Sequence, residues 1–170
     1  KKYGAVFPVT PGVLTQKYTA DQFEFHNFSV NEVINDFNLF LGKLRMINQA
    51  VRVIVTVSPV PLVATYDSSH VLVANCYSKS VLRAAVGEIC RTNEDVLYFP
   101  AYEVFTGSHT MGRLYAKDLR EAAPHGVKKV MSIFMGHFTE AGSGAGTREY
   151  DGLSSDTEIV CDEELVEPLY

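Results

Sequence analysis

The 170-residue sequence predicts an α/β fold with a mainly parallel sheet. Segments with helical periodicity alternate with short β-branched runs, in the order helix, strand, helix, strand, loop, helix. The β-branched run over 51–57 is typical of a strand that helices cover on both faces. Right-handed crossovers are expected to join parallel strands of this kind.

Three helices are predicted from apolar residues that recur three and four positions apart. The first runs from about Val30 to Ile47, and Ser29 with Glu32 would form a capping box at its start. The second covers about 76–90 with Asn75 as its N-cap, and the third begins near Pro124. The expected buried residues are Tyr77, Val81, Leu82, Ala85, Val86 and Ile89 in the second helix, and Val127, Val130, Met131, Phe134 and Phe138 in the third.

Two strands are predicted, over 51–57 and 95–99, and residues 3–7 could add a short edge piece. A sheet of so few strands is too small for the long first helix to cover. We therefore expect residues 1–139 to be the C-terminal portion of a larger domain. Residues 140–170 carry a net charge of −8 and many small polar residues, which predicts a flexible acidic tail.

Composition narrows the class of protein. With 46% hydrophobic and 21% charged residues, the chain is expected to fold, and its apolar runs are shorter than the roughly 20 residues of a membrane-spanning helix. A net charge of −5 without a dense Lys/Arg stripe argues against nucleic acid as a partner. Three scattered cysteines and the lack of a signal peptide favour a reducing, cytoplasmic location. The histidines lack metal-ligand spacing, so neither a metal nor a cofactor is expected.

Candidate ligand-binding residues follow the two predicted strands, because ligands of parallel α/β sheets bind at the carboxyl ends of strands. Ser58 follows the first strand, and Tyr102 and Glu103 follow the second. Glu103 could orient a base, bind a sugar hydroxyl or pair with an arginine, and Ser58 could simply satisfy backbone groups where its strand ends.

Other candidates lie near the helix starts. His26 and Asn27 precede the first helix and could bind substrate, or belong to a turn that leads into it. Cys76 and Lys79 lie one helical turn apart, which would favour a reactive thiolate, although a buried cysteine near a surface lysine is the commoner arrangement.

Asp118 and His125 are the candidate catalytic pair. They lie seven residues apart, and a serine hydrolase needs an Asp–His couple. The alternative is that His125 is only a polar residue in the first turn of the third helix.

Several blocks together resemble the GSCFA family over about residues 5–138. They include Phe7-Pro-Val-Thr-Pro-Gly12, Phe25-His-Asn-Phe-Ser-Val-Asn-Glu-Val33, Thr56-Val-Ser-Pro-Val-Pro-Leu62, Tyr77-Ser-Lys-Ser-Val-Leu-Arg83 and Tyr98-Phe-Pro-Ala-Tyr-Glu103. The family is placed with the SGNH-type hydrolases, which cleave or transfer acyl esters, often on carbohydrates. The resemblance implies a three-layer (α/β/α) SGNH/flavodoxin-like fold and an acylated small molecule or glycan as ligand.

Two departures from the family pattern matter for activity. The Gly-Ser-Cys-Phe-Ala block with the expected serine nucleophile does not occur in these 170 residues, and Glu121 stands where the Asp-x-x-His block of the superfamily has its histidine. Asp118 matches that block, and His125 would have to replace the missing histidine. The resemblance thus implies an esterase or acyltransferase whose nucleophile lies upstream, or else a non-catalytic carbohydrate-binding or assembly module.

Overall fold

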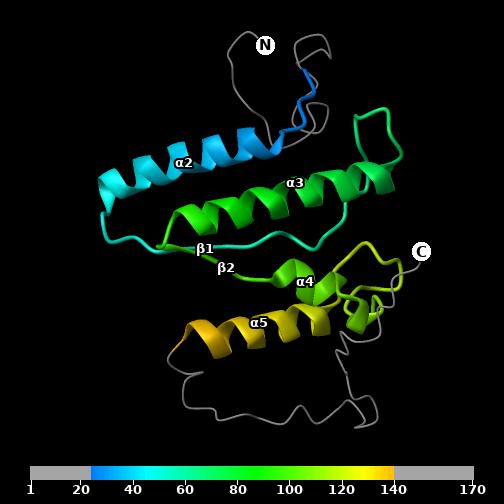
Figure 1. Ribbon diagram of the computed structural model, residues 1–170. Coiled ribbons are helices and arrows are strands. Elements are labelled where there is room, and N and C mark those ends of the chain that lie inside the picture. Colours follow the sequence, from blue (N-terminus) through cyan, green and yellow to red (C-terminus); the bar gives the residue numbers. More distant parts are fainter. Residues whose placement is uncertain (1–23, 140–170) are drawn as a thin grey trace, which may run out of the picture. The chain divides into compact units, whose positions relative to one another are not determined.

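The computed structural model describes residues 24–139, and Figure 1 shows the order of their helices and strands. The expected edge piece at 3–7 and the expected tail at 140–170 lie outside the described residues. The chain divides into two compact units, residues 1–132 and 133–170. All the candidate site residues lie in the first unit.

Helix α2, Val30–Ile47, confirms the first predicted helix and its capping box. The Ser29 hydroxyl accepts a hydrogen bond from the Glu32 backbone N–H at 3.4 Å, and Glu32 Oε2 accepts one from the Ser29 backbone N–H at 2.8 Å. Hydrogen bonds from the backbone and hydroxyl of Ser29, and then from His26, lower the pKa of Glu32 to about 2. The acidic side chain therefore stays ionised beside the positive end of the helix dipole.

Helix α3, Val71–Thr92, begins five residues before its predicted start, so the assignment of Asn75 as N-cap is wrong. The cap is His70, whose Nδ1 accepts from the Leu72 backbone N–H at 3.2 Å. Residues 71–74 include neither glycine nor proline, and the Asn75 side chain bonds outside the helix, so nothing breaks the helix there. The buried residues of α3 are Ala74, Lys79, Val81, Ala85 and Ile89.

The predicted buried face of α3 is only partly correct. Val81, Ala85 and Ile89 are buried, but Tyr77 is 51% exposed and Leu82 is 38% exposed. In their place Ala74 and Lys79 turn inward, because α3 packs with one narrow stripe against α2 and β2.

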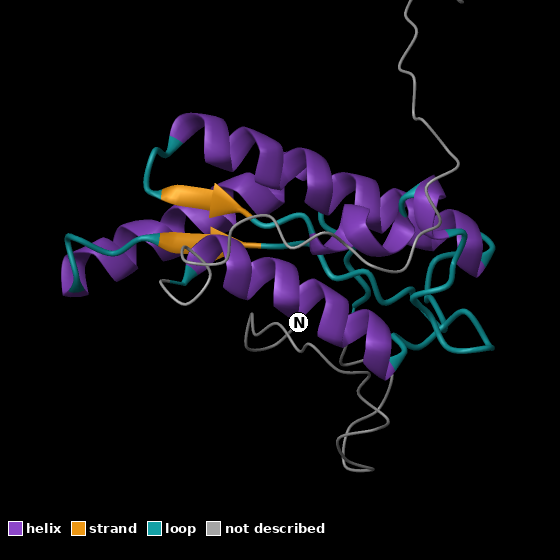
Figure 2. Ribbon diagram, turned by 90° about the horizontal axis from the view of Figure 1, so that it is seen from below, coloured by secondary structure: helices purple, strands orange, loops and turns teal. Residues whose placement is uncertain are grey.

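Within residues 24–139 the sheet consists of two parallel strands, β1 (Val53–Val55) and β2 (Val96–Tyr98), with Val53 opposite Val96. Figure 2 shows the two strands side by side and pointing the same way. Ile54 is 41% exposed, so the expectation that β1 is covered on both faces is wrong for the described residues. The sheet and its helices confirm the α/β class.

The core forms where α2, α3 and β2 meet, and Figure 1 shows α2 and α3 side by side. Leu41, Ile89 and Val96, one from each element, are fully buried and pack together. The predicted spacing of apolar residues thus brings α2 against α3, and α3 against the sheet.

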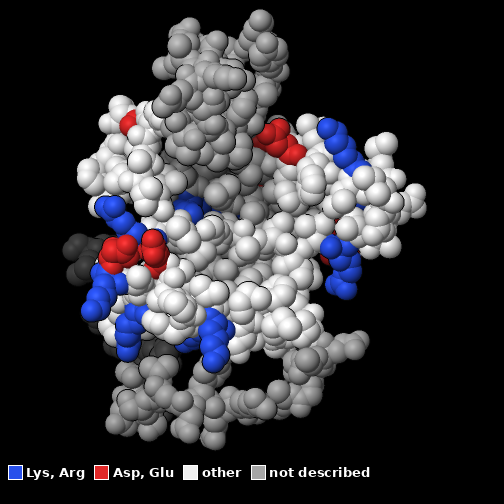
Figure 3. Space-filling model, turned by 180° about the vertical axis from the view of Figure 1, so that it is seen from behind, with Lys and Arg blue, Asp and Glu red and all other residues white. Residues whose placement is uncertain are grey.

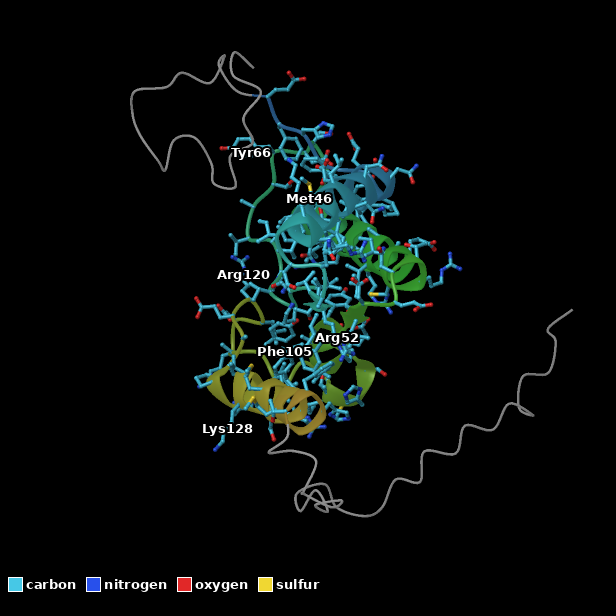
Figure 4. The ribbon with its side chains drawn as sticks, turned by 90° about the vertical axis from the view of Figure 1, so that its left-hand side faces the viewer. Met46, Arg52, Tyr66, Phe105, Arg120 and Lys128 are labelled. Carbon is cyan, nitrogen blue, oxygen red and sulfur yellow. The ribbon has the colours of Figure 1, made fainter. Side chains whose placement is uncertain are left out.

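Three helical segments follow β2: α4 (Ala101–Thr106), a 3-10 turn η2 (Ser108–Thr110) and α5 (Pro124–Phe138). Val130 of α5 is buried, but Val127 and Met131 are each 47% exposed, which corrects the predicted face. Phe105 of α4 is 2% exposed, and Figure 4 shows it inside the molecule, whereas Arg120 lies at the surface. In the second unit, the rings of Phe134 and Phe138 stack 5.1 Å apart. No described helix is long and apolar enough to cross a membrane.

Candidate functional site

Glu103 lies at the centre of a polar cluster just beyond the carboxyl end of β2. Tyr98, the last residue of β2, donates its hydroxyl to Glu103 Oε2 at 2.7 Å. Arg83 of α3 donates Nε to Glu103 Oε1 at 2.5 Å, and its guanidinium carbon lies 4.4 Å from the centre of the Tyr98 ring. The turn from β2 into α4 therefore brings the carboxylate back beneath α3, where it holds Arg83 in one orientation.

In this cluster the Glu103 carboxyl stays ionised and the Tyr98 hydroxyl stays protonated at neutral pH. Burial raises the pKa of Glu103, but hydrogen bonds from Tyr98 and Arg83 outweigh it and hold that pKa below its usual value of 4.5. Burial, followed by the hydrogen bond to Glu103, raises the pKa of Tyr98 well above 10. Both carboxylate oxygens of Glu103 are thus occupied, and its role is to pair with an arginine and position it.

An open groove of about 560 Å³ lies beside this cluster. Most of the lining comes from α3, in a row of residues that recur every four positions: Lys79, Arg83, Gly87 and Arg91. Tyr102 of α4 also lines the groove. A Cβ atom at Gly87 would lie 3.3 Å from Arg83 Nη1, so the glycine leaves room for the guanidinium at the groove wall. We call this feature the α3 groove.

The loop after β1 is tied to the same helix. Lys79 is only 7% exposed, and its Nζ donates to the Ser58 carbonyl at 2.7 Å. Tyr115 donates its hydroxyl to the Pro59 carbonyl at 2.8 Å, and Asn75 Oδ1 accepts from the Leu62 backbone N–H at 2.9 Å. Polar side chains thus fix the backbone of the loop and place it along α3.

The structure connects three of the predicted binding residues with the α3 groove. Tyr102 lines it, Glu103 anchors one of its arginines, and the Ser58 carbonyl binds Lys79. The Ser58 hydroxyl accepts a hydrogen bond from the Val60 backbone N–H at 3.2 Å, which is the backbone-satisfying role considered from the sequence.

His26 and Asn27 belong to the start of α2 and not to the residues that line the α3 groove. His26 Nε2 lies 2.9 Å from Glu32 Oε1, and its ring meets that of Phe28 edge-on at 5.0 Å. Asn27 is half-buried just before the helix. The two residues thus lie in the segment that leads into α2, in which the structure forms no turn.

Asp118 and His125 are each bound to backbone groups. Asp118 Oδ1 accepts from the backbone N–H of Arg120 at 3.0 Å and of Glu121 at 3.4 Å. The Arg120 N–H is the main cause that lowers the pKa of Asp118. His125 Nε2 lies 2.8 Å from the Arg113 carbonyl, which can only accept, so Nε2 carries the proton. No hydrogen bond between described residues joins the carboxylate to the imidazole.

The described cysteines give limited support to a reactive thiolate. Cys76 is exposed, but the ammonium of Lys79 is bound to the Ser58 carbonyl. Burial raises the pKa of the Cys90 thiol, which disfavours a thiolate there. Among residues 24–139, His, Cys, Asp and Glu side chains form no group of three that could hold a metal ion.

The sequence did not identify the basic side of the site. Lys79 is a candidate only beside Cys76, Arg83 appears only at the end of a block that resembles the family, and Arg91 is not among the candidates. The repeat of four residues from Lys79 to Arg91 was the available signal, because residues four apart are neighbours on a helix surface. Lys79 and Arg83 fall within the predicted helix, but Arg91 lies one residue beyond its predicted end, so the complete row required the observed end of α3 at Thr92.

Comparison with models of known families gives one match, to the GSCFA family, over residues 5–134. Comparisons with curated proteins and with solved structures find no significant match. The matched span contains the α3 groove, the loop at 58–62, Asp118 and His125. The blocks that resemble the family are therefore the segments from which the site is built.

Proposed function

The chain belongs to the GSCFA family, and on that premise we propose that it forms the substrate-binding part of an SGNH-like esterase or acyltransferase. Its substrates are acyl esters, including those of carbohydrates. The observation that carries the proposal is the α3 groove, where an anchored arginine and Tyr102 lie beside the carboxyl ends of two parallel strands.

In the proposed reaction a serine oxygen from outside these 170 residues attacks the ester carbonyl. The alcohol leaves with the proton that a histidine has taken from the serine, and an acyl-enzyme remains. Water then releases the acid, or the hydroxyl of a second substrate accepts the acyl group. In this chain His125 is the proposed base, and Asp118 would hold its ring in the required tautomer.

The observed geometry sets a condition on that role. His125 Nε2 donates to the Arg113 carbonyl, so this nitrogen has no lone pair to offer a serine. The ring must turn away from Arg113, and Asp118 must give up the backbone N–H groups of residues 120 and 121, before the two side chains can act together.

The groove would act on the non-reacting part of the substrate. The guanidinium of Arg83 is held by Glu103, so it is pre-organised to donate to ester or sugar oxygens. Tyr102 of α4 also lines the groove, and its aromatic ring is suited to contact with the face of a sugar ring. Glu103 acts through Arg83 and is a positioning residue.

The test uses the full-length protein that contains this chain. We expect a serine-reactive fluorophosphonate to label it and acetylated oligosaccharides to release acetate. Replacing the proposed base, His125→Gln, should lower kcat by at least about 100-fold. His137→Gln, which removes an exposed histidine of α5, is the matched control and should leave kcat unchanged. An unlabelled protein that is inactive on several acyl esters would refute the proposal.

A second function is favoured by the separate hydrogen bonds of Asp118 and His125. A carbohydrate-binding or assembly module that has lost catalysis needs no contact between these side chains. In that case glycan binding persists in Asp118→Ala and His125→Ala, and no ester is turned over. Binding that disappears in both correctly folded variants would count against this alternative.

A further inference from the structure

The α3 groove contains more hydrogen-bond donors than acceptors. Lys79, Arg83 and Arg91 line it, and the carboxylates at hand are Glu88 in the lining and Glu103 behind Arg83. Three cations thus face two anions. Because residues 140–170 alone carry a net charge of −8 and the whole chain −5, residues 1–139 are net positive, and the groove is one of their basic regions.

The hydrogen bonds and ion pairs within the groove do not use all the N–H groups of the two arginines. Lys79 is only 7% exposed and donates to the Ser58 carbonyl, so it contributes its positive charge to the groove from beneath the surface. Arg83 binds Glu103 through Nε, and Arg91 binds Glu88 through Nη2. A guanidinium has five N–H groups in a planar fork, so each arginine retains donors that match a carboxylate.

The shape of the groove favours an extended ligand over a single ion. Lys79 and Arg91 are separated by twelve residues of α3, which corresponds to roughly 18 Å along a helix. Arg83 lies between them in a row that turns by roughly 40° around the helix at each step of four residues, so acceptor groups along an extended ligand that follows this row could meet Arg83 and Arg91. Tyr102 also lines the groove and adds an aromatic surface.

We infer that the α3 groove binds an oligosaccharide that carries carboxylate groups, such as a polymer of uronic acids. The inference rests on the proposed function, because it names the substrate class of the same groove. Charge alone does not favour a nucleic acid, because much of the described surface on the face shown in Figure 3 carries no charged side chain.

The experiment measures binding to the full-length protein by calorimetry at low and at high salt. The ligand is tetragalacturonic acid, and its fully methyl-esterified form is the neutral control. Polyuridylic acid and inorganic polyphosphate test other anions. We expect the tetragalacturonate to bind, the methyl ester to bind at least about tenfold more weakly, and salt to weaken the binding.

Two neighbouring charge changes should have opposite effects. Arg91→Gln removes a cation of the row and should weaken tetragalacturonate binding by about tenfold, whereas Glu88→Gln removes the competing carboxylate and should strengthen it. Both side chains are largely exposed, so the fold should tolerate either change. Arg52→Gln is the matched control, since it removes an exposed arginine that does not line the groove, and it should leave affinity unchanged.

Several results would overturn the inference. They are absence of tetragalacturonate binding, equal binding of the methyl ester, equal binding of polyuridylic acid or polyphosphate, and an Arg91→Gln variant that behaves like Arg52→Gln. Binding as expected without ester turnover would support the inference and refute the esterase. Turnover without a preference for carboxylates would do the reverse.

Discussion

Gly126 in the first turn of α5 is the position where added volume should harm the fold most clearly. A Cβ atom there would meet the side chain of Phe105 at 3.0 Å and that of Leu114 at 3.1 Å, and the Leu114 carbonyl oxygen lies closer still. That carbonyl already accepts a hydrogen bond from the Ala123 backbone N–H at 3.0 Å. The glycine therefore allows α5 to pack directly on the backbone of the preceding loop.

The cost of Gly126→Ala can be worked out from these contacts. Because one of the close atoms belongs to the backbone, no side-chain rotation relieves the clash, and overpacking of this kind costs about 1–3 kcal/mol. Disturbing the bond from Ala123 adds about 1 kcal/mol, and the better helix propensity of alanine offsets up to about 1 kcal/mol. We expect a net loss of about 2 kcal/mol in the free energy of unfolding.

Urea unfolding followed by circular dichroism measures this change, which corresponds to a midpoint lower by about 1 M. Gly42→Ala is the matched control, because no described atom lies within 4 Å of a Cβ atom at that position of α2. It should stabilise the protein by about 0.5–1 kcal/mol. A Gly126→Ala variant as stable as the unmodified protein would show that α5 does not pack on the Leu114 backbone.

Three further changes test the capping and the charged side chains. Ser29→Ala removes the N-cap of α2 and should cost about 1 kcal/mol of unfolding free energy, and an unchanged urea midpoint would contradict the capping box. Glu103→Gln should cost at most about 1 kcal/mol at neutral pH, because the pair with Arg83 is about 40% exposed. The folded pKa of Glu103 lies below 4.5, so the stabilisation by ionised Glu103 is present above pH 4.5 and is lost as the pH falls through the folded pKa. The unfolding free energies of the unmodified protein and the variant should therefore converge at that acidic pH. Burial lowers the folded pKa of Lys79, so the unfolded state binds more protons below pH 10.5 and stability should rise as the pH approaches that value. Lys79→Met should remove this alkaline rise, and identical pH slopes for the two proteins would refute it.

Local signals in the sequence predicted the elements that local interactions determine. The bounds of α2 follow from Ser29, Glu32 and a regular apolar stripe, all of which act within a few residues. The places of β1 and β2 follow from β-branched runs. The start of α3 was missed because Asn75 is a common cap, and its actual partner, the Leu62 N–H, lies thirteen residues away.

The site depended on contacts that no local pattern contains. Glu103 and Ser58 were recognised because they follow strands, but their partners Arg83 and Lys79 lie twenty and twenty-one residues away along the chain. Asp118 and His125 were paired on their spacing and on the match of Asp118 to a family block, and the structure gives each of them a backbone partner instead. Spacing between a loop residue and a residue in the first turn of a helix says little about which way their side chains turn.

The short parallel ladder has a consequence for how the molecule folds. Its two strands are joined only through α3, so Val53 and Val96 must meet across more than forty residues of intervening chain. Closing so large a loop costs less conformational entropy once the crossover is already coiled into a stiff rod. We therefore expect α3 to be formed in the rate-limiting transition state, so that substitutions that weaken it slow refolding, while substitutions within the ladder mainly accelerate unfolding.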